Sequence, residues 1–153
     1  MAGYSLFNYV FAVKDRHNGN ILLDSKGRII HIDFGFWLQS SPGGISFEGA
    51  PFKLTQDYVE LLDGPDSELF AYFKSLLIKG FFSLRRNIDD IFVMIKIMTK
   101  KSKMPCFVKS ETLYTEIKER MSTKYNTGLN NEVEFYELVE NLVKSSLNNW
   151  RTK

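Results

Sequence analysis

One stretch, residues 14–35 with the sequence KDRHNGNILLDSKGRIIHIDFG, constrains the fold of this chain more than any other. Two polar segments, 15–20 and 33–35, flank a run of apolar residues interrupted by DSKG. The pattern predicts strands at 21–23 and 29–32, joined by a turn that ends in a glycine able to adopt positive φ. A buried hairpin of this kind fixes the distance between its flanks, so we expect Asn20 and Asp33 to lie side by side.

Polar residues so placed suit phosphoryl transfer. That reaction needs metal ions to neutralise charge, oxygen ligands to hold them and a polar group to orient the attacking hydroxyl. In the protein-kinase signature, the catalytic Asp precedes a metal-binding Asn by five residues and heads a segment that runs to D-F-G. Asp15 and Asn20 have the same spacing, and residues 33–35 read DFG, although the loop reads D-R-H where protein kinases have H-R-D. The two segments together therefore predict a kinase-derived loop.

The joined pattern, KDRHNGN…HIDFGF, resembles the catalytic and metal-binding loops of the phosphatidylinositol 3-/4-kinase family. It is most similar to the 4-kinases, because 3-kinases usually have Gly at the position of Lys14. The segments AGYSLFNYV, FKLT and MPCF are similar to the type III beta 4-kinases. The resemblance implies an α+β, predominantly α-helical fold: the C-terminal lobe (C-lobe) of a protein-kinase-like domain, with a small β-hairpin carrying the catalytic and metal loops.

Carried over by position, the resemblance implies roles for five residues. Asn20 and Asp33 would ligate Mg²⁺ and, through it, bind the cofactor ATP. Asp15 and His17 are the two candidates for handling the proton of the inositol hydroxyl; the pattern allows either, with a slight preference for Asp15 as the orienting group and His17 as the acceptor. Arg16 would hold the loop together. His31 lies mid-strand, where packing or loop anchoring is favoured over catalysis.

The implied reaction transfers the γ-phosphoryl group of MgATP to the 4-hydroxyl of phosphatidylinositol. The expected enzyme is cytoplasmic and peripheral at the cytosolic face of intracellular membranes, the Golgi among the candidates. Only fourteen residues precede Asp15, and the chain contains no G-x-G-x-x-G loop. We therefore expect residues 1–153 to form a single partial domain that lacks the N-lobe and has no appreciable kinase activity on its own. A partner protein that supplies or replaces the N-lobe would complete the kinase domain.

Two alternatives stay open. One is a truncated, inactive kinase remnant that acts as an interaction module. The other is a phosphatidylinositol 3-kinase fragment, which differs in the hydroxyl attacked. Between Phe34 and Phe52 the sequence has no Lys or Arg, and residues 36–54 hold the position of an activation loop. Extra phosphates on a headgroup would require basic partners there, so this loop favours unphosphorylated phosphatidylinositol.

Composition excludes several other classes of protein. A net charge of +2 is too small to indicate nucleic-acid binding, and the single Cys106 excludes an internal disulfide and suits a reducing compartment. No apolar run approaches 18 residues, so no membrane-spanning helix is expected. The first residues carry no basic leader, which argues against a signal peptide.

Apolar periodicity predicts helices at 2–13, at 56–63, from 67 to either 80 or 86, at 88–99, at 110–121 and at 131–149. Thr55 is the expected N-cap of the second helix, and Asp66 or Ser67 that of the third. The strongly apolar 88–99 helix is predicted to be central. Residues 123–131 are expected to form a polar loop. The basic run over 79–103 is assigned to a solvated face rather than to an anionic membrane.

Individual apolar residues are assigned as well. Phe36 and Trp37 are expected in the core, and Ile45 and Phe47 either in the core or at a membrane-touching rim. The side chains of the last helix predicted to face inward are Val133, Tyr136, Leu138, Val139, Leu142 and Val143.

Overall fold

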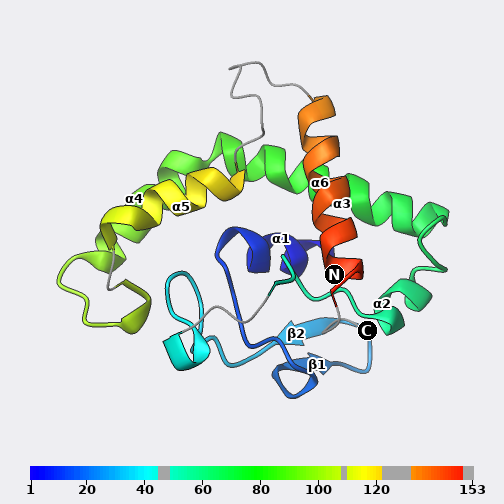
Figure 1. The fold of residues 1–153 in the computed structure, drawn as a ribbon, viewed down its shortest axis with the longest axis horizontal. Helices are drawn as coiled ribbons and strands as arrows, with labels where there is room; N and C mark the ends of the chain where they lie inside the picture. Colours follow the sequence, from blue (N-terminus) through cyan, green and yellow to red (C-terminus); the bar gives the residue numbers. More distant parts are fainter. Residues whose placement is uncertain (45–48, 108–109, 122–131, 150–153) are drawn as a thin grey trace.

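The computed structural model describes residues 1–44, 49–107, 110–121 and 132–149. These residues form a helix-rich fold with one small antiparallel hairpin, as expected (Figure 1). The helices are α1 (Ala2–Val10), α2 (Gln56–Leu61), α3 (Glu68–Arg86), α4 (Ile88–Thr99), α5 (Ser110–Met121) and α6 (Glu132–Leu147), and the strands are β1 (Ile21–Leu23) and β2 (Ile29–His31). Three short 3₁₀ turns are η1 (Asn18–Asn20), η2 (Pro42–Gly44) and η3 (Pro105–Phe107).

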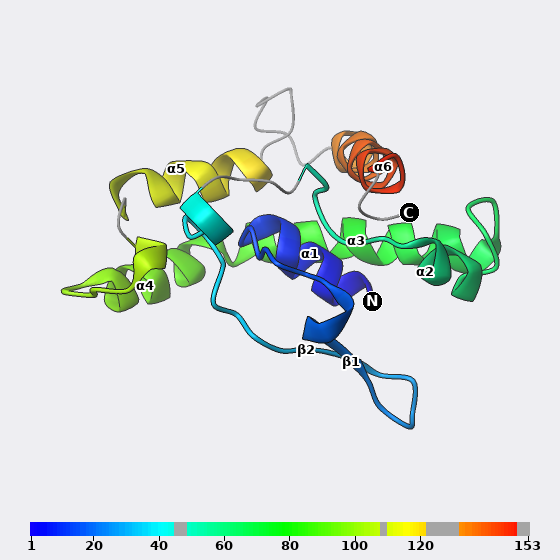
Figure 2. The ribbon, with the colours of Figure 1, turned by 60° about the horizontal axis from the view of Figure 1, so that its bottom comes forward.

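The long helix α3 organises the core. It buries one face, which carries Phe70, Phe73, Leu77 and Phe81 at helical spacing. Helix α1 packs along α3, and α6 crosses α3 (Figures 1 and 2). Helix α1 lies so close to α3 that a Cβ at Gly80 would overlap the Leu6 side chain. This close approach explains why a glycine stands in the interior of a helix that continues to Arg86.

The predicted helix starts are largely confirmed. Ser67 is the N-cap of α3, and its Oγ accepts a hydrogen bond from the Phe70 N–H at 3.0 Å. Thr55 is the N-cap residue of α2, but its side chain makes no capping bond. Helix α5 begins at Ser110, and Leu113, Ile117 and Met121 are buried on its inner side.

The prediction that the 88–99 helix is central was wrong. Only Ile95 of α4 is buried, and the outward face carries four large apolar side chains: Val93, Met94, Ile97 and Met98. A helix that is apolar on more than one face is usually enclosed, but among the described residues α4 is covered only on its inner side, where it meets α3 and α5. The contact with α5 includes the edge-to-face pair Phe92–Tyr114, with ring centroids 5.3 Å apart.

Two inward assignments in the last helix were also wrong. Val133 and Tyr136 of α6 are exposed, whereas Phe135, which was not assigned, is buried against Phe81 and Phe82. The other four predicted residues pack in or against the core as expected. Trp37 packs against the core, while Phe36 is half-buried. The predictions for Ile45, Phe47 and the 123–131 loop lie outside the described residues.

The hairpin has the predicted turn but not the predicted burial. Strand β1 pairs with β2 in the register Leu22↔Ile30, and the Asp24 carboxylate accepts hydrogen bonds from the N–H groups of Lys26 and Arg28. Figure 2 shows the hairpin projecting away from the helices. Its outward side is apolar and exposed, formed by Leu22, Ile30 and Ile32, and none of the described helices covers it. Within the described residues, no helix is long and apolar enough to cross a bilayer.

Candidate functional site

The backbone brings the two polar segments together as the sequence predicts. The Ile32 N–H donates to the Asn20 carbonyl at 3.0 Å, which extends the hairpin ladder by one step and places Asn20 one residue from Asp33 across the pair. Further along, the Lys14 N–H donates to the Phe36 carbonyl at 2.8 Å. The segment between α1 and β1 and the segment after β2 therefore run side by side at the base of the hairpin.

Arg16 joins these segments from the inside. Its side chain is only 6% exposed, and its guanidinium donates to the carbonyls of Lys14 (2.9 Å), Ile32 (2.8 Å) and Asp33. A planar guanidinium presents five N–H donors in a fixed fork, which a lysine ammonium does not reproduce. Its carbon Cζ also lies 5.4 Å from the centroid of the Phe34 ring. These contacts agree with the expected role of Arg16 in holding the loop together.

Asn20 and His17 lie close together in the predicted catalytic loop. Asn20 is buried, and its Nδ2 donates to the Asp15 carbonyl at 2.9 Å. The ring of His17 caps η1: its Nδ1 accepts the Gly19 N–H at 3.1 Å. A Cβ at residue 19 would lie 3.0 Å from that ring, so the glycine permits the contact. The Asp15 Oδ2 lies 3.9 Å from the His17 Nε2, and both side chains face solvent.

The hydrogen bond from Gly19 fixes the tautomer of a neutral His17. A backbone N–H only donates, so Nδ1 carries no proton and the ring holds its proton on Nε2. Asn20 Nδ2 lies 3.2 Å from this Nε2, which makes the approach a contact between two donors rather than a hydrogen bond. The nearest carboxylate oxygen to the Nε2 proton is then that of Asp15.

The oxygen atoms around Asn20 and Asp33 suit a hard cation. Because the Asn20 Nδ2 faces the Asp15 carbonyl, the Oδ1 of the same amide points elsewhere and stays available as a ligand. Asp33 is exposed, and one of its oxygens, Oδ1, accepts the Gly35 N–H at 3.2 Å. Mg²⁺ prefers oxygen ligands and is bound in kinases by one or two side chains plus substrate phosphates. The donor set fits that ion, and the ligand roles stay predictions.

Both motif aspartates adopt left-handed backbone conformations. The φ angle is 61° at Asp15 and 54° at Asp33. Aspartate tolerates this region better than most non-glycine residues, but it is still uncommon and disfavoured by roughly 1 kcal/mol. The same conformation occurs at Ala12, Leu38, Asp63 and Lys101, so it is not confined to the two polar segments.

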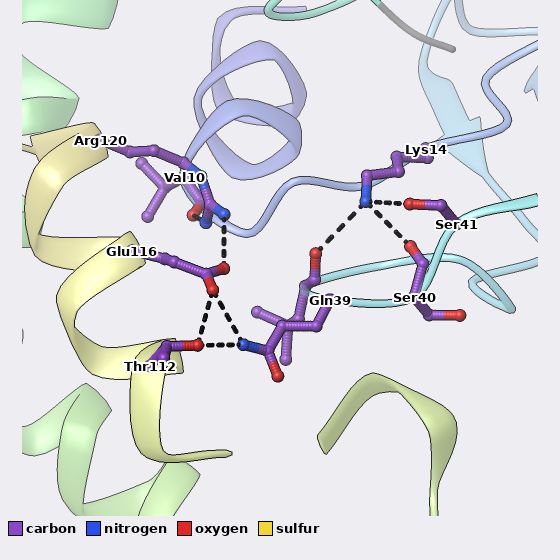
Figure 3. Close-up of polar contacts among 9 residues, drawn as sticks. Val10, Lys14, Gln39, Ser40, Ser41, Thr112, Glu116 and Arg120 are labelled. Atoms are coloured by element: carbon purple, nitrogen blue, oxygen red, sulfur yellow. Dashed lines mark hydrogen bonds and ion pairs between the residues drawn. The ribbon is translucent and has the colours of Figure 1, made fainter. Parts of the chain in front are cut away.

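Several anchoring residues escaped the sequence reasoning. Lys14 reaches the loop after the hairpin, where its Nζ donates to the Ser40 carbonyl (3.0 Å) and to Ser41 Oγ (2.5 Å) (Figure 3). Lys53 Nζ donates to Asn18 Oδ1 at 2.8 Å. The partners are 26 to 35 residues apart, so no local spacing signals them.

Helix α5 anchors the same region from the other side. Gln39 Nε2 donates to Thr112 Oγ1 (2.8 Å) and Glu116 Oε1 (2.9 Å), and Arg120 donates to the Val10 carbonyl at 2.9 Å (Figure 3). Burial raises the pKa of Glu116, but hydrogen bonds from Gln39 and Thr112 and the charge of Arg120 outweigh it, so the net shift is downward. An ionised Glu116 therefore links the loop to Arg120.

His31 packs against a neighbouring ring instead of facing the candidate site. It is buried, and its ring stacks on Tyr4 with centroids 4.1 Å apart and an interplanar angle of 11°. Burial and then the charge of Arg16 lower the pKa of His31 from 6.5 to about 4. The packing part of the sequence prediction is confirmed.

The lowered pKa of His31 predicts how stability depends on pH. Between about pH 6.5 and pH 4 the unfolded chain binds a proton at His31 that the folded chain does not. The free energy of unfolding should therefore be highest above pH 6.5 and fall as the pH drops towards 4, by at most ~1.4 kcal/mol per pH unit from this group. Urea unfolding across this range, for the chain and for His31→Phe, isolates the effect. Parallel pH curves for the two proteins would contradict it.

Comparisons with known proteins identify a family. A family model described as phosphatidylinositol 3- and 4-kinase matches residues 1–109. The chain is 46% identical over 153 residues to a phosphatidylinositol 4-kinase of Dictyostelium discoideum and covers 12% of that protein. It is also 46% identical over 157 residues to phosphatidylinositol 4-kinase beta 1 of Arabidopsis thaliana, and 43% identical over 152 residues to phosphatidylinositol 4-kinase beta of Danio rerio.

These alignments include essentially the whole chain but a small part of each relative. They cover 100% of the chain for the Arabidopsis protein and 99% for the Danio protein, yet 14% and 18% of those relatives. The segments predicted to be catalytic and metal-binding both fall within residues 1–109, the part that the family model matches.

Proposed function

Because the chain belongs to the phosphatidylinositol 3- and 4-kinase family, we propose that it forms the C-lobe of a phosphatidylinositol 4-kinase catalytic domain. The parent reaction transfers the γ-phosphoryl group of MgATP to the 4-hydroxyl of phosphatidylinositol at a cytosolic membrane face. The observation that carries the proposal is the pair of polar segments, DRHNGN and DFG, joined by the buried Arg16 in a chain 43–46% identical to proteins named as 4-kinases.

Asn20 and Asp33 would hold Mg²⁺, which when bound neutralises charge that develops on the phosphoryl group. The exposed apolar side of the hairpin, Leu22, Ile30 and Ile32, lies beside this pair and suits the adenine ring of ATP. An N-lobe or a partner protein would cover the opposite side of the nucleotide. The exposed Phe34 ring belongs to the same uncovered surface.

The tautomer of His17 supports a division of labour between the two candidate bases. In neutral His17 the basic lone pair is on Nδ1 and is taken up by the Gly19 N–H. Asp15 has a solvent-facing carboxylate and is the better placed acceptor for the inositol proton. His17 then orients the substrate or Asp15 through its Nε2–H. This assignment reverses the slight preference drawn from the sequence.

Paired variants test that assignment. In an active enzyme that contains this chain, Asp15→Asn should lower kcat by about 10²–10⁴-fold, the usual contribution of a general base. His17→Gln, which keeps a side-chain donor, should lower kcat by less. Steady-state kinetics at several pH values measure both. A larger loss for His17→Gln than for Asp15→Asn would return the acceptor role to His17.

The loop after the DFG segment supports unphosphorylated phosphatidylinositol as the substrate. Residues 36–51 contain no Lys or Arg, and the ammonium of Lys14, which reaches this loop, is engaged by the loop's own oxygens. A headgroup that already carries phosphates would find no basic partner among residues 36–51.

The decisive experiment replaces the matching segment of the Dictyostelium phosphatidylinositol 4-kinase with residues 1–153 and assays the chimera. We expect phosphorylation of phosphatidylinositol at the 4-hydroxyl, identified by headgroup chromatography, and little turnover of phosphorylated inositol lipids. A 3-phosphorylated product would favour the 3-kinase alternative. A folded but inactive chimera would favour the interaction module instead.

A further inference from the structure

The outward face of α4 and the segment that follows it form an exposed apolar surface that the proposed reaction does not use. Four large apolar side chains, Val93, Met94, Ile97 and Met98, are between 47% and 69% exposed, and Met104 is 50% exposed. Helix α4 is already packed on its inner side, where Phe92 meets Tyr114 and Ile95 is buried. The outward face therefore contributes nothing to the core, although exposing it to water is unfavourable.

The charges on the C-terminal half of α4 and on the segment after it have one sign. Lys96, Lys100, Lys101 and Lys103 are exposed, and the sequence from Ile91 to Ser110 contains no Asp or Glu. In the described part of the chain, none of these four lysines forms an ion pair. The acids of α4, Asp89 and Asp90, lie at its opposite, N-terminal end. Exposed apolar side chains flanked by unpaired lysines are typical of helices that lie in a membrane interface.

The same surface adjoins the loop that we assign to the lipid headgroup. The indole of Trp37 meets the ring of Phe107 edge-on, with centroids 6.2 Å apart. Figures 1 and 2 both place η2 and the segment after α4 at the end of the molecule that α4 and α5 occupy. A bilayer in contact with this segment would therefore lie beside the loop at residues 36–44.

We propose that the C-terminal half of α4 and residues 100–104 form a docking surface for an anionic lipid bilayer. The apolar side chains enter the interface, and the lysines contact the anionic headgroups. This inference rests on the proposed function, because a lipid kinase must hold its reactive loop at the membrane. It differs from the sequence-based expectations, which placed the 88–99 helix in the core and the basic run over 79–103 on a solvated face.

Vesicle binding of the 153-residue chain tests the surface without any catalytic readout. The probes are vesicles of phosphatidylcholine alone and of phosphatidylcholine with phosphatidylserine or phosphatidylinositol, measured by flotation at low and physiological salt. Substituting Lys100, Lys101 and Lys103 together by Gln should weaken binding to the anionic vesicles on the order of a hundredfold, since each lysine near the surface contributes about one kcal/mol. The matched control substitutes the exposed Lys26, Lys79 and Lys144 by Gln and should bind nearly as the parent chain does.

A second pair of variants tests the apolar part. Met94→Gln with Ile97→Gln should weaken binding roughly tenfold, whereas Leu61→Gln with Leu69→Gln, which are similarly exposed elsewhere, should not. Circular dichroism and urea midpoints verify that each variant is folded. Equal binding by the α4 variants and their controls would overturn the proposal, as would no binding of the parent chain to any vesicle.

Two further readouts separate the alternatives. Sedimentation that shows a dimer dissociated by Met94→Gln with Ile97→Gln, without a change in vesicle binding, would assign the face to a second copy of the chain and overturn membrane docking. An inactive chimera combined with vesicle binding that depends on α4 would remove the proposed kinase function but leave the docking surface. An active chimera whose vesicle binding does not depend on these residues would support the proposed kinase function and overturn the docking surface.

Discussion

Asp33→Asn in the active chimera is expected to lower kcat by at least about 10³-fold, which corresponds to roughly 4 kcal/mol of transition-state stabilisation. The carboxylate supplies a negatively charged oxygen to Mg²⁺, and a neutral amide binds a divalent ion far less well. Asparagine also tolerates the positive φ at this position, and its Oδ1 can still accept the Gly35 N–H. The variant should therefore fold as the parent does and lose only the metal.

The matched control is Asp24→Asn. This carboxylate lies in the hairpin turn, where hydrogen bonds from the Arg28 backbone and side chain, with a smaller contribution from Lys26, lower its pKa. Its loss should leave kcat within a few-fold of the parent. Kinetics as a function of Mg²⁺ concentration add a second criterion, since Asp33→Asn should require more metal. An Asp33→Asn enzyme with a kcat within tenfold of the parent and an unchanged Mg²⁺ requirement would reject Asp33 as a ligand.

Arg16→Gln is expected to lower the free energy of unfolding of the 153-residue chain by about 3 kcal/mol. Hydrogen bonds from a charged donor contribute about 1.5–3 kcal/mol each, and buried carbonyls left without a donor are unfavourable. Three carbonyls, those of Lys14, Ile32 and Asp33, lose their guanidinium donor together. The effects overlap because one side chain serves all three, so the sum is smaller than three separate bonds.

Urea unfolding with a fixed m-value measures this loss, and two further variants interpret it. Arg16→Lys keeps the charge but not the fork of donors, so its stability should fall between those of the parent and Arg16→Gln. Arg28→Gln removes an exposed arginine paired with Asp24 and should change stability by less than about 1 kcal/mol. Equal midpoints for Arg16→Gln and Arg28→Gln would show that Arg16 does not hold the two segments together.

The sequence predicted the local geometry of the site well. The turn after β1 follows from DSKG, and the pairing of the two polar segments follows from the length of the hairpin. The role of Arg16 in holding the loop together was implied by the family resemblance, and its contacts agree with that role. These features depend on contacts among residues 14–35, where the chain has little freedom to arrange itself otherwise.

Burial and distant anchoring could not be predicted in the same way. The exposed hairpin and the outward face of α4 have the composition of buried elements. The local sequence does not indicate which side of such an element a neighbouring element will cover. Gln39 bonds to Thr112, 73 residues away, through ordinary polar side chains that carry no periodic signal. The tautomer of His17 depends on the path of the backbone at Gly19, which spacing alone does not reveal.

The bond between Arg120 and the Val10 carbonyl has a consequence for how the protein is made. The two residues are 110 positions apart, so the ribosome adds the donor about 5–20 s after the acceptor. During that interval the nascent chain already contains α1, residues 14–20 and the exposed hairpin, without α5 to anchor them. This segment is thus translated before the helix that anchors it, and a chaperone that binds apolar nascent segments would find a target in the hairpin.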